Sequence, residues 1–415
     1  MNFTEDDLDC PTFSEEDENT IEFFSFWVEG VANVVMAALG LVANTVSSLI
    51  LCKEDMRNSF NFLLIALFFM DSCYLVGSIT EAIRKSFNAA TSLHLYMFPY
   101  FLYPCLSIAM TCSVFMTVAV ALERYIAVHY PIDYSQAINS PEACRRRLFK
   151  YVIPVVIMAV FVNAPKFFES TVGEHAILTH PNTSMLQIGN GSVPIQVSDA
   201  DITYIKRIEV TDLRKDPTYT IYYNNWTRLM LIGIVPFILL IYFNYKIYQD
   251  VKHRNRRQMS MSRHSATATQ QARRRQEDNL AIVFMGIVLV FLICHSPRLI
   301  LSMHEMMIIH DAMKCQAQRL HPFHAWTLIT MCVSHLLLVI NSSINMILYI
   351  FLNESFRRHF VGMVRSVGGL AHCFMRNPEE DIRIRHLGNG HETASNNGIE
   401  KDNGHTEIIF QEATA

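Results

Sequence analysis

Charged residues are scarce in this chain: 17% of its 415 residues are Asp, Glu, Lys or Arg, whereas 51% are hydrophobic. This composition is too apolar for an ordinary soluble protein and predicts several membrane spans. The charged residues that are present are separated by sign along the chain. Residues 1–29 contain ten acids and no Lys or Arg, whereas Lys246 to Arg275 contain nine Lys or Arg and one acid, Asp250. We expect these two segments to lie on opposite sides of a membrane.

Other common sequence signals are absent as well. The amino terminus has no basic segment followed by a long apolar stretch, so we expect the first span, and not a signal peptide, to direct membrane insertion. The ten cysteines form no CxxC pair, which argues against a zinc ribbon or a dense disulfide scaffold. No nucleotide-binding loop or hydrolytic constellation suggests an enzyme. We therefore expect neither enzymatic activity, nor a required cofactor, nor a nucleic acid partner.

Seven apolar segments are long enough to cross about 30 Å of hydrocarbon. They are Trp27–Cys52, Phe60–Ile83, Tyr96–Val128, Phe149–Ala164, Leu229–Tyr248, Ala281–Met303 and Phe323–Phe351. The predicted fold class is an all-α membrane protein, a seven-transmembrane helix bundle that occupies residues 27–351.

Basic residues predict the orientation of this bundle. Three clusters fall on one side: Arg145 to Arg147, the nine basic residues between the fifth and sixth spans, and Arg357 with Arg358. The positive-inside rule makes this side cytoplasmic, so we expect a plasma-membrane protein with an extracellular amino terminus and a cytoplasmic carboxyl terminus. The glycosylation sequons at Asn2, Asn182 and Asn190 all fall on the predicted outer side.

The remaining segments divide into tails, loops and one short helix. An acidic extracellular tail is expected at 1–26 and a disordered cytoplasmic tail at 367–415. The second extracellular loop, about 167–223, is long enough to carry structure, and the β-branched stretch at 202–210 predicts a strand within a hairpin. Phe356 and Phe360, four residues apart beside basic residues, predict a short cytoplasmic interfacial helix at 352–366.

A charged pair ends the third apolar segment, in Glu123-Arg124-Tyr125. Charges at a helix end in a membrane are costly unless they pair or reach water, so the pair marks either a functional site or an arginine that snorkels to the lipid headgroups. With Pro131 a few residues later, the motif resembles that of the rhodopsin-like G-protein-coupled receptors. Gly40-Leu41-Val42-Ala43-Asn44 in the first span and Asp71 in the second are similar to further motifs of this family.

The resemblance implies a sodium site around Asp71. Similar receptors hold this ion between the aspartate and four further side chains, which here are Ser113, Asn341, Ser342 and Asn345. An all-oxygen site suits sodium as a hard cation. The alternative is a protonated Asp71 in a hydrogen-bonded network, because burial favours the neutral carboxylic acid.

Several family features are replaced or missing. His295 stands where tryptophan is usual in the sixth span, and Met346 replaces proline in Asn345-Met346-Ile347-Leu348-Tyr349, which removes a proline-directed kink. Neither the top of the third span nor the loop at 167–223 contains a cysteine, so the usual family disulfide is impossible. Cys10 and Cys315 are the two clear cysteines on the oxidising side, and they are either paired or free thiols.

Three strings narrow the resemblance to the invertebrate FMRFamide-receptor group: Cys294-His295-Ser296-Pro297-Arg298, Asn163 to Glu169, and Asn225 to Leu229. Neighbouring groups, myosuppressin receptors included, share some of these strings. The resemblance implies a receptor for a short amidated neuropeptide that ends in Arg-Phe-amide. Its guanidinium, ring and amide need acids, aromatics and polar groups, and the candidates are Glu81, Glu169, Glu305, Tyr100, Tyr103, His295, Arg298 and His335.

The resemblance also implies a switch on the inner side. We expect Arg124 to pair with Glu123 and Glu277 at rest and to be released to a heterotrimeric G protein when the sixth span moves. Asn345 and Tyr349 of the seventh span belong to the same switch, and Ile132 is a candidate coupling contact. Arrestin and membrane lipids are further expected partners, and Cys373 is a candidate for palmitoylation.

Three alternatives to a peptide receptor fit the sequence less well. An opsin would need a retinal-bearing lysine in the seventh span, and 323–351 contains none. A transporter or proton pump would need intramembrane acids along a path and repeated halves, and neither is evident. A histidine metal site would have to be formed by His304, His321 and His324, which lack a strict ligand spacing.

Overall fold

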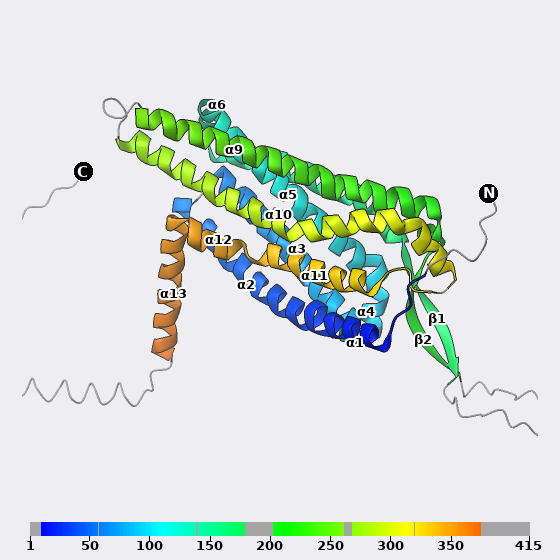
Figure 1. Cartoon of the computed structure of the whole chain (residues 1–415). Helices are drawn as coiled ribbons and strands as arrows, with labels where there is room; N and C mark the ends of the chain where they lie inside the picture. Colours follow the sequence, from blue (N-terminus) through cyan, green and yellow to red (C-terminus); the bar gives the residue numbers. More distant parts are fainter. Residues whose placement is uncertain are drawn as a thin grey trace, which may run out of the picture. The chain divides into compact units, whose positions relative to one another are not determined.

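The computed structural model describes residues 10–56, 58–137, 140–178, 202–260, 268–318 and 320–374. Seven of its helices are long and apolar enough to cross a membrane: Glu15–Leu51, Ser59–Lys85, Ser92–His129, Glu142–Phe168, Tyr219–Arg254, Phe284–Gln316 and Ala325–Ser343. The seven predicted spans and the helix-bundle fold class are thereby confirmed (Figure 1).

The first span consists of α1 (Glu15–Phe23), the π-helical η2 (Phe24–Ala32) and α2 (Asn33–Leu51). It begins at Glu15, inside the range 1–26 in which a tail was expected. A capping box explains the early start, because the Ser14 hydroxyl accepts from the Asp17 amide at 3.2 Å and the Asp17 carboxylate accepts from the Ser14 amide at 3.0 Å. These bonds satisfy amide groups that a helix start otherwise leaves unpaired.

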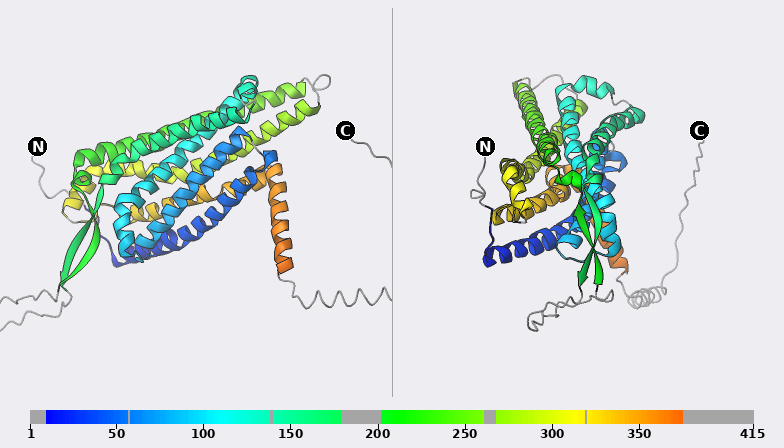
Figure 2. Two further views of the ribbon diagram at one scale, coloured as in Figure 1. Left: turned by 180° about the vertical axis from the view of Figure 1, so that it is seen from behind. Right: turned by 90° about the vertical axis from the view of Figure 1, so that its right-hand side faces the viewer.

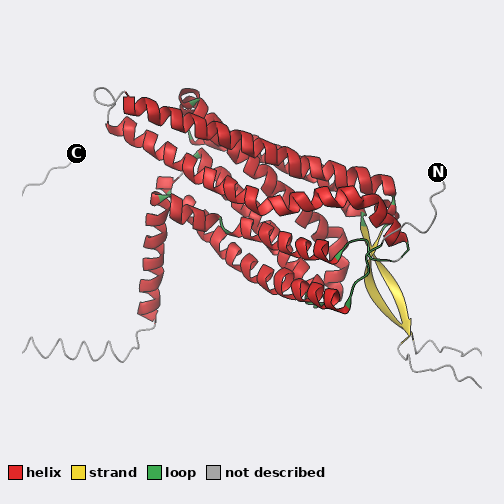
Figure 3. Cartoon of the chain, in the orientation of Figure 1, coloured by secondary structure: helices red, strands yellow, loops and turns green. Residues whose placement is uncertain are grey.

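Figure 3 shows that the other spans are helical as well. The second span is α3 (Ser59–Lys85), which follows the turn η3 (Glu54–Met56). The third is α4 (Ser92–Met97), η4 (Phe98–Leu102) and α5 (Tyr103–His129), and α6 (Pro131–Ala137) follows it. The fourth is α7 (Pro141–Asn163) with η5 (Ala164–Phe168), and the fifth is η7 (Tyr219–Thr227), η8 (Leu229–Ile234) and α9 (Val235–Ser260) after α8 (Asp212–Lys215). The sixth is α10 (Ala268–Ala317), and the seventh is α11 (Ala325–Ser343) with α12 (Asn345–Leu352).

The first and seventh spans approach each other closely at Gly40. A β-carbon built on Gly40 would lie 2.1 Å from the Ser343 hydroxyl oxygen, so only glycine permits this distance. One turn later Asn44 donates from its side chain to the carbonyl of Ser342 at 3.0 Å. The small residue and the amide that follows it therefore fix α2 against α11.

The seventh span is interrupted at Ile344, between α11 and α12. The sequence predicts that Met346 removes a proline-directed kink, and the helix is nevertheless interrupted here without proline. Ser343 binds the carbonyl of Val339 in its own helix at 2.7 Å and that of Met36 in the first span at 3.1 Å. Serine bonds of this kind can bend a helix.

A two-stranded antiparallel hairpin lies at one end of the bundle (Figures 1 and 2). Its strands are β1 (Ser170–Leu178) and β2 (Ile202–Val210), and Ser170 pairs with Val210. The strand predicted at 202–210 is thereby confirmed. We call this end of the bundle, with β1 and β2, the hairpin end, and the end with α6 the opposite end.

The helix α13 (Glu354–Phe374) follows the seventh span and extends past the predicted range of 352–366. It starts at a side-chain cap, because the Asn353 side chain accepts from the Phe356 amide at 3.0 Å. The rest of the predicted tail, 375–415, lies outside the described residues.

Candidate functional site

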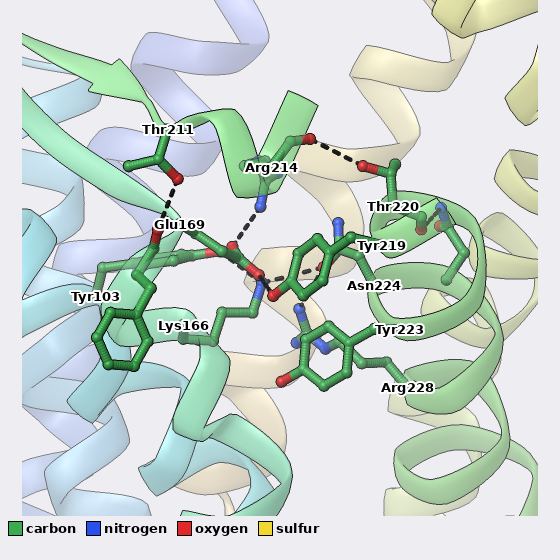
Figure 4. A network of polar contacts seen from close by, with 12 residues as sticks. Tyr103, Lys166, Glu169, Thr211, Arg214, Tyr219, Thr220, Tyr223, Asn224 and Arg228 are labelled. Atoms are coloured by element: carbon green, nitrogen blue, oxygen red, sulfur yellow. Dashed lines mark hydrogen bonds and ion pairs between the residues drawn. The ribbon is translucent and has the colours of Figure 1, made fainter. Parts of the chain in front are cut away.

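A buried carboxylate, Glu169, holds the base of the hairpin to three membrane spans (Figure 4). Lys166 of the fourth span donates to it at 2.8 Å, and Tyr103 of the third span donates at 3.1 Å. Arg214 of α8 donates at 2.5 Å, and Tyr219 of the fifth span donates to the second oxygen at 2.8 Å. One carboxylate therefore joins the third, fourth and fifth spans.

The surroundings of Glu169 keep it ionised. Burial works to raise its pKa, but the charges and hydrogen bonds of Lys166 and Arg214 outweigh burial and hold the pKa below its ordinary value. Stability gained from a lowered carboxyl pKa is present above the ordinary value and is lost as the pH falls through the lowered one. The attachment is thus complete at neutral pH and weakens in acid.

Three further bonds fasten the hairpin. The Thr211 hydroxyl donates to the carbonyl of Phe168 at 2.6 Å, and its amide donates to the carbonyl of Glu169 at 3.0 Å. The hydroxyls of Tyr100 and Thr171 lie 3.0 Å apart. These bonds attach the hairpin to the helix bundle, since this loop has no cysteine that could form a disulfide.

The disulfide between Cys10 and Cys315 is formed, with 5.7 Å between the two α-carbons. It connects the amino-terminal segment to the end of α10, as one of the two alternatives from the sequence expects. Beside it the rings of Phe13 and His321 stack at 4.1 Å. The amino-terminal segment is therefore fixed at the end of the sixth span.

A second buried carboxylate, Glu29 of η2, was missed in the sequence analysis. It accepts from Lys85 of the second span at 2.8 Å and lies 2.8 Å from the His335 ring of the seventh, with the Cys332 thiol at 3.5 Å. His335, predicted to bind ligand, is thus bound to Glu29. The signal was present, because Glu29 is the one charged residue between Phe23 and Leu51 and an acid at that depth needs partners.

The three acids predicted to bind ligand differ in their hydrogen-bond and ion-pair partners within the protein. Glu81 pairs with Arg84 at 2.6 Å, and Glu169 holds the hairpin. Glu305 differs, since its Oε1 atom is buried and has no hydrogen-bond partner among the described residues. Arg298, seven residues earlier on the same face of α10, lies close enough to Tyr74 to act on it electrostatically.

The residues predicted to bind sodium lie together around Asp71, which is 1% exposed. Ser113 and Asn345 donate to its carboxylate at 2.5 and 2.9 Å, and Ser342 lies close to it. A cavity of about 10 Å³ adjoins them, lined by Tyr74, Met110, Ser113, Val114, His295, Leu338, Asn341 and Ser342. This is roughly the space that one water molecule occupies.

His295 forms one wall of that cavity. Its Nδ1 atom lies 3.0 Å from the carbonyl of Phe291, and the two rings stack at 3.7 Å. The side chain therefore faces the polar centre of the bundle, where it replaces the larger ring that is usual in similar receptors.

At the opposite end, Glu123 is fully buried and accepts from Nε of Arg147 at 2.9 Å. Arg124 lies over the Phe60 ring at 3.7 Å and donates to the Tyr134 hydroxyl of α6 at 3.3 Å. Burial raises the pKa of Tyr134 to about 12, so this hydroxyl is neutral. Arg147 as a partner of Glu123 was not expected from the sequence.

The other predicted switch residues are placed as follows. Tyr349 is fully buried and packs against Phe68 at 6.1 Å, whereas Ile132 on α6 is 71% exposed. Glu277 lies within α10, but its side chain is outside the described residues, so its pairing with Arg124 stays a prediction.

Four modification sites cannot be placed. Asn2, Asn182 and Asn190 lie outside the described residues, and so does the side chain of Cys373 in α13. Within the described ranges, no three His, Cys, Asp or Glu side chains are grouped to hold a metal ion.

Known proteins resemble this chain over a third to more than four fifths of its length. An FMRFamide receptor of Drosophila melanogaster is 29% identical over 357 residues, which are 83% of this chain and 54% of that receptor. The sex peptide receptor-related protein 2 of Caenorhabditis elegans is 20% identical over 256 residues, 60% of this chain and 50% of the relative. The FMRFamide peptide receptor frpr-18 of the same nematode is 32% identical over 146 residues, 33% of this chain and 32% of the relative. The chain thus spans about half, or less, of each of these relatives.

The model of one family matches this chain at residues 44–177 and 210–349, two ranges that together contain all seven spans in whole or in part. Its description is 7 transmembrane receptor (rhodopsin family). The proteins of this family are receptors and not enzymes. The chain is a multi-pass membrane protein that belongs to the rhodopsin family of seven-transmembrane receptors.

Proposed function

We propose that the chain is a G-protein-coupled receptor for a short amidated neuropeptide that ends in Arg-Phe-amide. The hairpin end then faces the outside of the cell, and the opposite end faces the G protein. Two relatives carry the name FMRFamide receptor, which supports this class of ligand. A receptor for another peptide class, such as myosuppressin, is the alternative.

The observation that carries this proposal is the open carboxylate of Glu305. The Oε1 atom of this partly buried carboxylate is buried and has no hydrogen-bond partner among the described residues. Such an atom is costly, and a guanidinium is the group that best compensates it. His304, the preceding residue of α10, has its ring 4.7 Å from that of Trp326, and the two rings offer an aromatic surface on the same turn of the helix. Arg298 is in position to meet carbonyl groups of the peptide further into the bundle.

A peptide screen tests the proposal. Cells that express the chain are exposed to amidated peptides and to the same peptides with a free carboxyl terminus, with calcium and cyclic AMP as readouts. We expect responses to amidated peptides that end in Arg-Phe, and weaker responses to the free acids. Silence toward every Arg-Phe-amide peptide, with the receptor present at the cell surface, would reject this ligand class. A response to myosuppressins alone would favour the alternative.

The proposed switch makes Glu277 a restraint on Arg124. Replacing Glu277 with alanine should raise signalling without agonist several-fold, because a lost ion pair no longer favours the resting state. The measurement is basal cyclic AMP or calcium signalling at matched surface expression. Glu54→Ala is the control, since Glu54 is an exposed acid in η3. Equal basal activity in the two variants would count against the restraint.

The Asp71 cluster is proposed to hold sodium. Replacing sodium with a large organic cation should change agonist affinity of the unmodified receptor by about tenfold, within the usual range of coupling between two sites. Asp71→Asn should remove this dependence. Radioligand binding in the two salts measures this dependence of agonist affinity on sodium. If the agonist affinity of the unmodified receptor is the same in both salts, a protonated Asp71 in a hydrogen-bonded network is favoured instead.

The remaining sequence predictions are part of the same proposal. They are glycosylation at Asn2, Asn182 and Asn190, palmitoylation at Cys373, and contacts with arrestin and membrane lipids.

A further inference from the structure

Two basic side chains bind the carboxylate of Glu169, and a third lies close to them. Lys166 is 1% exposed and Arg214 is 35% exposed, and both donate to Glu169. Arg228, at the start of η8, is the third, and its charge acts unfavourably on the ammonium group of Lys166, as does that of Arg214. Among the described residues, Glu169 is the one acid with which this cluster pairs. The cluster therefore carries excess positive charge.

Arg228 has few partners for its five N–H groups. Its one hydrogen bond among the described residues reaches the Asn224 side-chain oxygen at 3.5 Å, and that oxygen also accepts from Lys166 at 3.1 Å. Figure 4 shows Arg228 beside Tyr223 and Asn224, on the far side of Lys166 from Arg214. Arg228 is partly exposed and has N–H groups to spare, so it can bind a second anion.

The cluster lies next to the span that carries Glu305. A β-carbon built on Gly233 of η8 would lie 2.9 Å from a methyl group of Leu299 in α10 and 3.6 Å from one of Leu229. Arg228 immediately precedes Leu229, and Leu299 immediately follows Arg298. The fifth span thus contacts the sixth at Gly233 and Leu299, and α10 continues from there toward Glu305 at the hairpin end.

We propose that Lys166, Arg214 and Arg228 form an anion-binding subsite that takes a carboxylate side chain of the peptide, located upstream of its amidated end. The proposal rests on the proposed function, because it assumes a peptide whose arginine meets Glu305. Opposite charges on neighbouring spans then select a peptide that carries an acid and a base at different positions. Arg228 supplies the unused donors, and Lys166 and Arg214 supply the surrounding positive field.

Pairs of peptides test this subsite. Each pair ends in Arg-Phe-amide and differs only by Asp against Asn at one upstream position, and the position is moved along the peptide from pair to pair. Competition binding is measured on the unmodified receptor, on Arg228→Gln, and on Lys206→Gln as a matched loss of an exposed positive charge on β2. We expect the unmodified receptor to prefer Asp by about tenfold in at least one pair, as for a charge-assisted hydrogen bond.

The preference for Asp should disappear in Arg228→Gln, because this variant weakens binding of the Asp peptide of a pair more than binding of the Asn peptide. It should persist in Lys206→Gln. Two results would overturn the subsite while the proposed function stands: equal binding of Asp and Asn in every pair, or an Arg228→Gln variant that weakens both peptides of a pair equally. If no peptide of any pair binds the unmodified receptor at the cell surface, the proposed function fails as well.

Discussion

Replacing Glu305 with glutamine should lower the potency of an Arg-Phe-amide peptide by about 100-fold, which is the scale for losing one partner of a buried, hydrogen-bonded charge pair. Glutamine keeps the size of the side chain but removes the negative charge that a guanidinium needs. The buried Oε1 atom has no partner among the described residues, so the substitution breaks no bond shown in the structure. Concentration–response curves at matched surface expression measure the effect.

Asp311→Asn is the matched control, because Asp311 lies on the same helix but is 70% exposed and pairs with Lys314. We expect its potency to stay within a few-fold of the unmodified receptor, as for other exposed ion pairs. If Glu305→Gln and Asp311→Asn behave alike, Glu305 does not bind the peptide.

The second large effect is expected at Glu169. Glu169→Gln leaves the buried Lys166 and the partly exposed Arg214 without their counter-charge. Breaking the buried pair of Lys166 and Glu169 costs about 3–5 kcal/mol. The fifth span and the hairpin then lose their common attachment to α5. We expect a marked drop in the thermal unfolding temperature of the purified receptor and reduced surface expression. Both effects result from the lower stability of the folded receptor, so they can be measured without a ligand.

Two comparisons make this result specific. Glu174→Gln on β1 removes a carboxylate that is 61% exposed and 3.7 Å from Lys206, and it should change the unfolding temperature little. Lys166→Gln combined with Glu169→Gln should be more stable than Glu169→Gln alone, since one unpaired charge is removed. A double variant as unstable as the sum of the two single variants would mean that the two residues do not act as a pair.

The spans and the hairpin strand followed from local features of the sequence. Apolar stretches of sufficient length predict helices regardless of what they pack against, and the β-branched residues at 202–210 predict a strand in the same way. Cys10 and Cys315 were paired by compartment alone, and the structure decided between the disulfide and free thiols. The start of the first helix at Glu15 was missed because hydropathy ignores the capping box of Ser14.

The polar partners could not be predicted in the same way. Glu29 with Lys85 and His335, and Glu123 with Arg147, join residues from different spans, and only the packing of the helices brings them together. Glu169 and His335 were named from the resemblance as ligand contacts, but each is bound within the protein. Which acid is open to a ligand therefore depends on tertiary pairing, and the structure leaves Glu305 without a hydrogen-bond partner among the residues it describes.

The most direct test of the account is a double-mutant cycle between receptor and peptide, measured by competition binding. One arm is Glu305→Gln, and the other replaces the penultimate arginine of an Arg-Phe-amide peptide with citrulline, which keeps the shape but removes the charge. If the arginine binds Glu305, each change alone weakens binding, and the two together weaken it little more than one does. Independent losses that multiply in the combined measurement would contradict this placement of the ligand.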